Sequence, residues 1–358
     1  MRRAMREVAM QMVNNEPRIG SFQGCSPTGF HEVFYAEWGD PAAARVIVCC
    51  HGLTRNGRDF DFLARRLADG IDFALAERQR EQVRDHIHET APRGGIAGWI
   101  GARLERWLAP APEPAESVDA NLVHPALQPL PVRVICPDVT GRGRSEWLKD
   151  PANYGYPQYM SDMTALIARL GVPQVDWIGT SMGGLIGMFL AASPNSPIRS
   201  LVINDVGPVV PRAAMQRIAD YVGLDPRFDS LDALEAYLRK VHAPFGPLTD
   251  AQWAHLARHS HRFLADGSYG LAYDPGIAIN ARLGVRDWDF WASWDRVTCP
   301  ALIVRGQESD LLEPEVAEAM TVRGPKAELI EFPGVGHAPS LMADDQIERV
   351  SQWLARQG

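Results

Sequence analysis

Ser181 stands in the pentapeptide Gly-Thr-Ser-Met-Gly of residues 179–183, a spacing that suits nucleophilic catalysis. A short β-rich run, residues 175–178, precedes it, and an apolar run of helical length, residues 184–192, follows it. A strand, a sharp turn and a helix in this order expose a serine hydroxyl at the tip of the turn. The two flanking glycines permit the close crossing of strand and helix that such a turn needs. An ordinary capping serine at a glycine-rich helix start is the less favoured interpretation, because catalytic partners also occur.

A serine hydroxyl is a weak nucleophile unless an imidazole takes its proton and a carboxylate orients that imidazole. His337 ends the sequence Pro-Gly-Val-Gly-His, directly after a predicted strand at residues 327–332. A histidine in a glycine-rich turn after a late strand is more specific than a histidine elsewhere in the chain. We therefore expect His337 to be the general base for Ser181.

Two aspartates are candidates for the carboxylate. Asp310 lies in the loop after a predicted strand at residues 301–305, and it gives the chain order serine, acid, histidine. Asp205 follows the predicted strand at residues 199–204, directly before a long helical segment. We expect Asp310 to orient the histidine and Asp205 to stabilise the loop in which it lies.

A fourth element is His51-Gly52-Leu53-Thr54, which follows the β-rich run of residues 46–50. A strand that ends in His-Gly commonly supplies half of an oxyanion hole. We expect the backbone N–H groups of Leu53 and Met182 to be the two donors. The side chain of His51 is expected to hold the loop and to take no part in catalysis.

These motifs together resemble the α/β-hydrolase superfamily, and within it the bacterial serine hydrolases with a cap domain. The resemblance covers most of residues 30–358. It is carried by His-Gly, Asp-x-x-Gly-x-Gly-x-Ser, Gly-x-Ser-x-Gly-Gly, Ser-Asp and Gly-His, all in the family order. The dehalogenases and epoxide hydrolases of this superfamily have an aspartate where Ser181 stands, so the resemblance disfavours those activities.

The elements that must position these residues alternate between strand and helix. Strands are predicted at residues 19–23, 32–38, 45–50, 132–136, 174–179, 199–204, 301–305 and 327–332, and helices at 58–69, 159–170, 183–192, 314–321 and 343–356. This alternation predicts an α/β fold with a mainly parallel sheet and helices on both faces. With eight strands, it fits the α/β-hydrolase fold that the resemblance implies.

Two insertions interrupt this core, which we assign to residues 1–207 and 296–358. Residues 208–295 are predicted to form a helical cap, with helices at 213–222, 231–241 and 251–265. The segment 71–131 is longer than the usual connection between a helix and a strand. Its predicted helix at 96–108 has an apolar stripe with Trp99 and Trp107. This stripe must be buried against another apolar surface. We expect it to extend the core, to form a second lid, or to bind another copy of the chain.

Substrate contacts are expected from the end of the cap and from the oxyanion loop. Trp288 and Trp291 belong to an aromatic cluster just before the strand at residues 301–305. We take both as candidate substrate contacts and expect at least one indole to line the acyl or alcohol pocket. Arg55 or Arg58, just past the oxyanion loop, could bind a carboxylate on the substrate, but a solvent-facing position is the favoured interpretation.

Composition excludes several other classes of protein. The chain has 358 residues and a net charge of −8, which argues against a broad nucleic-acid surface. No apolar run in the sequence reaches membrane-spanning length. Its five cysteines form no Cys-x-x-Cys pair, which favours reduced thiols in a cytoplasmic protein. His255 and His259 are four residues apart without a glutamate between them, so we expect a solvated helix face and no metal.

The sequence therefore predicts a cytoplasmic serine hydrolase that cleaves small carboxylic esters through an acyl-enzyme. No metal, organic cofactor, nucleic acid or stable membrane association is expected. Carbon–carbon bond hydrolysis of ring-cleavage diketone acids, lactone hydrolysis and acyl transfer remain alternatives within the same chemistry. A binding protein without turnover is a second class, but such a protein need not keep nucleophile, base and acid together.

Overall fold

The computed structural model describes residues 16–69 and 131–357. The predicted insertion at 71–131, with its helix at 96–108, lies outside these residues except for its last position. Its assignment as a lid, a core extension or a surface for a second copy therefore stays a prediction.

An eight-stranded sheet forms the centre of the fold, with the strand order β1-β2-β4-β3-β5-β6-β11-β12. The strands are β1 (Arg18–Ser26), β2 (Gly29–Gly39), β3 (Arg45–Cys50), β4 (Val132–Pro137), β5 (Val175–Thr180), β6 (Ile198–Asn204), β11 (Ala301–Gly306) and β12 (Glu328–Phe332). The pairs β1–β2 and β2–β4 are antiparallel, and every other neighbouring pair is parallel. The predicted mainly parallel eight-stranded sheet is confirmed.

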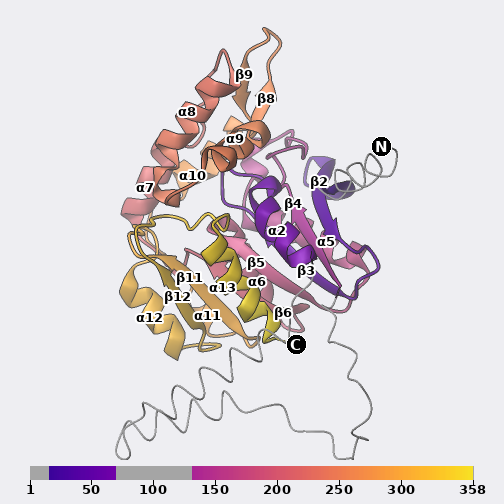
Figure 1. Ribbon diagram of the computed structural model, residues 1–358, viewed down its shortest axis with the longest axis vertical. Helices are drawn as coiled ribbons and strands as arrows, with labels where there is room; N and C mark the ends of the chain where they lie inside the picture. Colours follow the sequence, from indigo (N-terminus) through magenta and orange to yellow (C-terminus); the bar gives the residue numbers. More distant parts are fainter. Residues whose placement is uncertain (1–15, 70–130, 358) are drawn as a thin grey trace, which may run out of the picture.

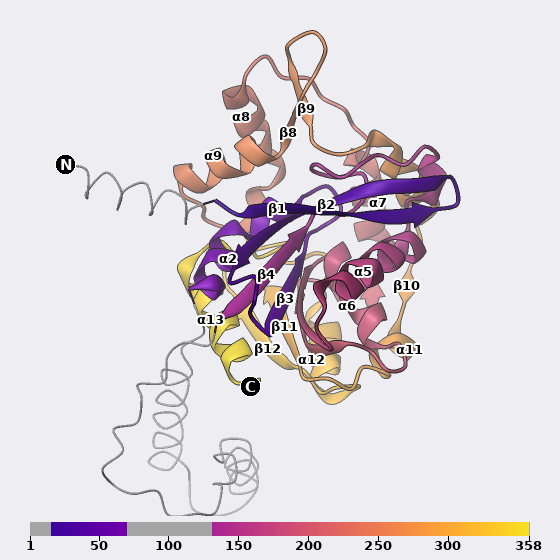
Figure 2. The ribbon, with the colours of Figure 1, turned by 90° about the vertical axis from the view of Figure 1, so that its right-hand side faces the viewer.

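Helices cover both faces of the sheet (Figure 2). They are α2 (Asp61–Ala68), α5 (Tyr156–Leu170), α6 (Met182–Ala191), α12 (Pro314–Val322) and α13 (Asp344–Ala355). The helices α5, α6 and α12 contribute to one apolar core layer, and α2 and α13 contribute to the layer on the opposite face. The short 3-10 helices η1 (Gly57–Phe60) and η2 (Pro151–Asn153) lie in the connections.

Strand β3 illustrates why these sequences form central strands. Its residues Val46 and Val48 pack into the layer that contains α5 and α6. The alternate residues Ile47 and Cys49 pack into the layer that contains α2 and α13. Because successive side chains of a strand point to opposite faces, a strand covered on both sides must be apolar throughout.

The segment between β6 and β11 is called the cap below, and its elements α8, α9, β8 and β9 stand beyond one end of the sheet, at the top of Figure 1. Its elements are β7 (Val209–Val210), α7 (Arg212–Tyr221), α8 (Leu231–Val241), η3 (Ala243–Phe245), α9 (Asp250–His259), β8 (His261–Phe263), β9 (Tyr269–Leu271), η4 (Pro275–Ile277), α10 (Ala278–Leu283), β10 (Trp288–Asp289) and α11 (Trp291–Trp294). The helix predicted at 251–265 was too long. It ends at His259, because His261 to Phe263 pair with β9 in a hairpin.

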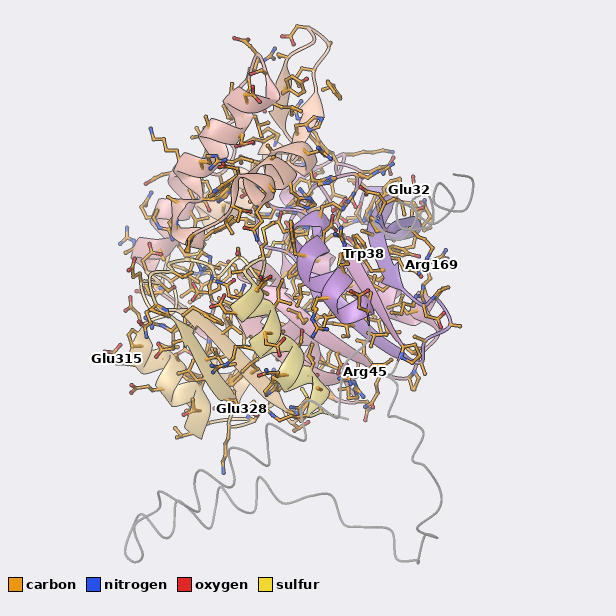
Figure 3. The ribbon with its side chains drawn as sticks, in the orientation of Figure 1. Glu32, Trp38, Arg45, Arg169, Glu315 and Glu328 are labelled. Carbon is orange, nitrogen blue, oxygen red and sulfur yellow. The ribbon has the colours of Figure 1, made fainter. Side chains whose placement is uncertain are left out.

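The carboxyl ends of the parallel strands face the cap. Arg45 begins β3 and Glu328 begins β12, and both lie at the edge of the sheet away from the cap (Figure 3). Loops at the carboxyl ends of neighbouring parallel strands converge, which is where ligands bind in open α/β sheets. The loops after β3, β5, β6, β11 and β12 therefore meet beneath the cap.

The described parts of the chain contain no helix that is both long and apolar enough to cross a membrane. All five cysteines are free thiols, and Cys49, Cys50 and Cys136 are buried in the core strands. The expectation of buried reduced thiols is confirmed for these three residues, whereas Cys25 is exposed.

Candidate active site

Ser181 occupies a strained turn between β5 and α6. Its φ of 51° and ψ of −114° lie in a region that non-glycine residues rarely adopt. A Cβ atom on Gly179 would collide with the carbonyl oxygen of Gly183, and one on Gly183 would collide with that of Cys50. The backbone N–H of Ser181 donates to the carbonyl of Asn204 at 2.8 Å, which fixes the turn against β6. The predicted strand–turn–helix geometry is confirmed.

His337 connects the serine to an acid. Its Nε2 lies 3.0 Å from the hydroxyl oxygen of Ser181, and its Nδ1 lies 2.7 Å from Oδ2 of Asp205. Since the carboxylate of Asp205 accepts a hydrogen bond from the Nδ1–H group, Nε2 is left as the acceptor for the serine hydroxyl. The side chain of Asp205 is fully buried, and that of His337 is 14% exposed. This hydrogen-bonded chain has the geometry of a nucleophile, a base and an orienting acid.

Asp205 is held in place by further donors from the loop after β11. Its Oδ1 accepts the backbone N–H of Gly306 at 2.9 Å, and its Oδ2 accepts the hydroxyl of Ser309 at 2.7 Å. The strands β6 and β11 are parallel neighbours, so their carboxyl ends bring these residues together. A buried carboxylate needs such partners to offset the loss of water.

The prediction that Asp310 orients the histidine is wrong. Its side chain is 54% exposed and forms an ion pair of 2.6 Å with Arg217 of the cap helix α7. The neighbouring Ser309 points inward to Asp205, and its hydroxyl also accepts the backbone N–H of Leu311 and Leu312. This turn directs Asp310 away from the site and toward the cap.

The ring of His51 fixes the loop after β3, which contains one of the two residues expected to bind an oxyanion. The ring of His51 donates from Nδ1 to the carbonyl of Gly52 at 2.7 Å, and its Nε2 accepts the N–H of Val139 at 2.9 Å. Burial lowers the pKa of His51 to about 4, so the ring is neutral near pH 7 and both contacts persist. The ring holds the loop, as expected from the sequence. Leu53 lies in this loop, two residues after His51. Met182 is the first residue of α6, where backbone N–H groups have no partner within the helix.

Arg142 lies behind this loop and was not among the predicted site residues. Its side chain is completely buried. Its Nε donates to the carbonyl of Leu53 at 2.9 Å, and its NH2 group lies 3.7 Å from the sulfur of Met182. It therefore contacts both residues expected to bind an oxyanion. The sequence placed Arg142 in a glycine-rich loop, but nothing in that pattern indicated its burial.

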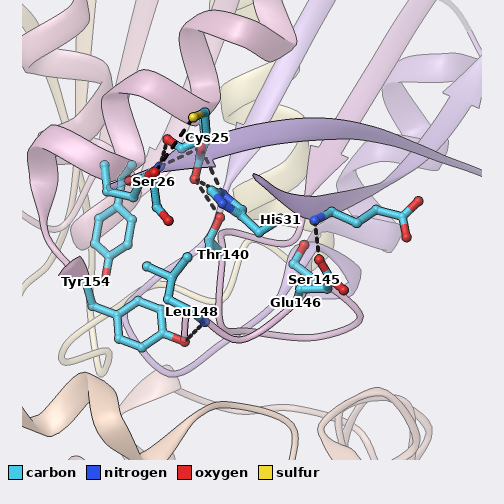
Figure 4. Close-up of polar contacts among 12 residues, drawn as sticks. Cys25, Ser26, His31, Thr140, Ser145, Glu146, Leu148 and Tyr154 are labelled. Atoms are coloured by element: carbon cyan, nitrogen blue, oxygen red, sulfur yellow. Dashed lines mark hydrogen bonds and ion pairs between the residues drawn. The ribbon is translucent and has the colours of Figure 1, made fainter. Parts of the chain in front are cut away.

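The loop that carries Arg142 is fixed from two sides. The hydroxyl of Ser145 accepts the backbone N–H of Phe34 in β2 at 2.9 Å. The hydroxyl of Tyr154 accepts the N–H of Leu148 at 2.8 Å, and this contact is visible in Figure 4. Tyr154 in turn donates to Asp274 of the cap at 2.7 Å. These bonds connect the loop both to the sheet and to the cap.

Two cavities adjoin Ser181. The small cavity has a volume of about 120 Å³, and the large cavity has a volume of about 510 Å³. The lining of the small cavity is mainly apolar and aromatic, and it includes Leu53, Tyr156, Leu185, Val206, Met215 and Trp288. The lining of the large cavity includes Arg55, Arg217, Tyr237, Lys240, His242 and His337. Leu53, Ser181 and Ile218 line both cavities.

Two of the three predicted substrate-binding residues line a cavity beside Ser181, and the third does not. Trp288 lines the small cavity and Arg55 lines the large one. The guanidinium of Arg55 is not solvent-facing. It is buried and forms a bidentate ion pair with the carboxylate of Asp59, with hydrogen bonds of 2.7 and 2.8 Å. Trp291 lines neither cavity, so its prediction is wrong. The guanidinium carbon of Arg323 lies 4.1 Å from the centre of the Trp291 ring, which is partly buried against the core.

His255 and His259, for which a solvated helix face was expected, lie in a partly buried cluster with Asp61. Their ligand atoms are within 4.8 Å of one another. Burial raises the pKa of Asp61 to about 7 and lowers that of His259 to about 3. Oδ2 of Asp61 also accepts Nε of Arg58 at 2.6 Å, so a metal ion would have to displace or share a cationic partner. This contact favours a structural ion pair over a metal centre.

Comparison with known proteins relates the chain to a family of hydrolases. The model of the alpha/beta hydrolase family matches residues 105–352. The chain is 40% identical to the 3-hydroxybutyrate-oligomer hydrolase of Cupriavidus necator over 94% of this chain and 98% of that protein. It is 28% identical to the 2-(acetamidomethylene)succinate hydrolase of Mesorhizobium japonicum over 59% of this chain and 76% of that protein.

A solved structure gives the same result. A putative hydrolase from Rickettsia typhi aligns with a TM-score of 0.74 and 27% identity, over 95% of this chain and all of that one. The family match, the near full-length relative and the sheet topology lead to one conclusion. The chain belongs to the alpha/beta hydrolase family.

Proposed function

We propose that the chain is a carboxylic-ester hydrolase and that its substrates are oligomers of 3-hydroxybutyrate. The observation that carries the ester chemistry is the hydrogen-bonded chain from Ser181 through His337 to Asp205, which ends at the junction of two cavities. The relative from Cupriavidus necator supports the substrate, because the two chains match over nearly their whole lengths.

In this proposal Ser181 attacks the ester carbonyl while His337 takes the serine proton. The N–H groups of Leu53 and Met182 stabilise the oxyanion, and His337 then protonates the leaving alcohol. Water hydrolyses the acyl-enzyme with His337 again as the base. Asp205 keeps the imidazole in the required tautomer and stabilises its charged form.

A substrate panel tests this function. The full chain should hydrolyse the linear dimer of 3-hydroxybutyrate, and its kcat/KM for p-nitrophenyl butyrate should exceed that for the decanoate at least about tenfold. The small cavity of about 120 Å³ sets this limit, since a cavity of ~150 Å³ holds benzene but no long alkyl chain.

The panel also includes a lactone and a ring-cleavage diketone acid. Turnover of the diketone acid without turnover of the dimer would favour carbon–carbon bond hydrolysis. Equal rates for the butyrate and decanoate esters would contradict the assignment of the acyl group to the small cavity.

Arg142→Met should lower kcat by roughly 10- to 100-fold. The substitution removes the donor to the carbonyl of Leu53 and leaves that carbonyl unsatisfied. Loss of one oxyanion donor alone costs ~10²-fold or more, and this variant only displaces the loop that holds one. Steady-state kinetics on p-nitrophenyl butyrate measures the effect.

Arg144→Met is the matched control, because Arg144 is an exposed residue of the same loop that packs over the ring of Phe34. We expect it to keep nearly normal kcat. A lower melting temperature with unchanged kcat in Arg142→Met would show that Arg142 supports only the fold.

A further inference from the structure

The two cavities differ in their relation to the triad. His337 lines the large cavity and is absent from the lining of the small one. In ester cleavage the leaving alcohol takes its proton from the histidine, so it must leave on the histidine side of the carbonyl. This places the leaving part of the substrate in the large cavity. The acyl part then occupies the small, mainly apolar cavity.

The charged side chains that line the large cavity are all cationic. Among the described residues that line it, the charged side chains are Arg55, Arg217 and Lys240, and no aspartate or glutamate lies in the wall. Arg55 is paired with Asp59, and Arg217 is paired with Asp310. Lys240 has no ion pair within the described residues.

Arg217 and Lys240 retain donors for a further acceptor, whereas NH1 of Arg55 contacts Nε2 of His242 at 3.4 Å. The contacts to Asp59 use Nε and NH2 of Arg55, and those to Asp310 use Nε and NH2 of Arg217. The NH1 group of Arg217 and the ammonium of Lys240 are therefore available to a carboxylate, which forms its strongest hydrogen bonds with cationic donors. An anionic group in this cavity would meet no repelling carboxylate in the wall.

A 3-hydroxybutyrate oligomer has a hydroxyl at one end and a carboxylate at the other. The lining of the small cavity includes polar groups suited to the hydroxyl end, among them the hydroxyl of Tyr156. Tyr156 lines it, and no described residue forms a hydrogen bond with the Tyr156 hydroxyl. The cationic wall of the large cavity suits the carboxylate end.

We propose that the large cavity is a carboxylate subsite, formed by Lys240 and Arg217, that binds the acid end of an oligoester and directs cleavage to its hydroxyl end. This inference rests on the proposed function. It specifies which ester bond is cut and which product leaves. The enzyme releases single hydroxyl-terminal units and a shortened oligomer that keeps its carboxylate.

The placement of the two ends of the substrate defines which bonds form and which break. Oγ of Ser181 forms a bond to the carbonyl carbon of the hydroxyl-terminal unit, and the ester C–O bond to the next unit breaks. His337 passes the serine proton to the departing alkoxide, which becomes the new hydroxyl end of the shortened oligomer. Water then adds to the acyl-enzyme, and one molecule of 3-hydroxybutyrate leaves.

A labelled trimer tests the direction of cleavage. The hydroxyl-terminal unit carries ¹³C, and mass spectrometry follows the first products of the full chain at low conversion. We expect labelled monomer and unlabelled dimer. Labelled dimer with unlabelled monomer would overturn the direction alone. Hydrolysis of p-nitrophenyl butyrate without any hydrolysis of the trimer would instead refute the proposed substrate, and the direction with it.

A second experiment tests the cationic subsite. It compares kcat/KM for the dimer with that for the same dimer whose acid end is a carboxamide. The wild type should favour the free acid at least about tenfold, a typical effect of a charged hydrogen-bond partner. Lys240→Gln and Arg217→Gln should each lower this ratio toward one, and Lys240→Glu should invert it.

Arg227→Gln is the control for this experiment. Arg227 is an exposed cap arginine paired with Asp266, and it does not line the large cavity. It should keep the wild-type ratio. A wild-type ratio near one, or an unchanged ratio in both the Lys240 and the Arg217 variants, would show that the cavity does not select a carboxylate.

Discussion

Asp205→Asn lowers kcat by about 10⁴-fold, which is the loss typical of a triad histidine left in the wrong tautomer. An asparagine at this position would present an amide to Nδ1 of His337 in place of the carboxylate oxygen that now lies 2.7 Å away. The imidazole would lose the partner that stabilises its charged form. A factor of 10⁴ corresponds to ~5.4 kcal/mol of lost transition-state stabilisation.

Asp310→Asn is the matched comparison, since both substitutions change one oxygen of an aspartate near the carboxyl end of a strand. We expect it to lose less than about tenfold in kcat, because Asp310 is half exposed and its ion pair with Arg217 is of the surface type. Steady-state kinetics and melting curves on both variants show which of the two aspartates orients His337. A larger loss in Asp310→Asn than in Asp205→Asn would reverse the assignment.

The sheet and the nucleophile could be predicted because their signals are local. The strand β3 must be apolar on both faces. The turn at Ser181 needs glycines at the positions where any Cβ would collide with the backbone. Both requirements act over a few consecutive residues. The loop at His51 is only partly local in this sense, because its ring bonds the adjacent Gly52 but also Val139, which is distant in sequence.

The acid could not be chosen from the sequence because its choice depends on tertiary hydrogen bonds. Asp205 and Asp310 follow parallel neighbouring strands, so both reach the same edge of the sheet. Their orientation depends on Ser309, which bonds to Asp205 and turns Asp310 outward. The positive φ of Asp205, 59°, indicates a constrained loop, but it is visible only in the structure.

Arg142 and Asp61 were missed for a related reason. Arg142 contacts Leu53 and Met182, which are distant from it in sequence. Asp61 approaches His255 only when α9 of the cap packs beside η1 and α2. No sequence motif or hydrophobic period indicates the role of either residue. Each role depends on contacts that form only in the folded chain.

Ser181→Ala should lower kcat by at least about 10⁴-fold, because without the hydroxyl no acyl-enzyme can form. The fold should persist, since the only side-chain hydrogen bond of Ser181 within the described residues is that to His337, and its backbone bond to Asn204 does not involve the hydroxyl. Melting curves should therefore match the wild type closely. Residual hydrolysis would come from binding and the oxyanion donors.

A fluorophosphonate reagent tests the covalent step independently of turnover. It should label the wild type at Ser181 alone, as read by peptide mass spectrometry, and leave Ser181→Ala unlabelled. Ser193→Ala is the matched control, because Ser193 is exposed near the end of α6 and, among the described residues, its hydroxyl bonds only the carbonyl of Phe189. That variant should keep both labelling and activity. Labelling of another serine, with near-normal turnover in Ser181→Ala, would place the nucleophile elsewhere, and the chain of contacts from Ser181 to Asp205 would then be a structural feature.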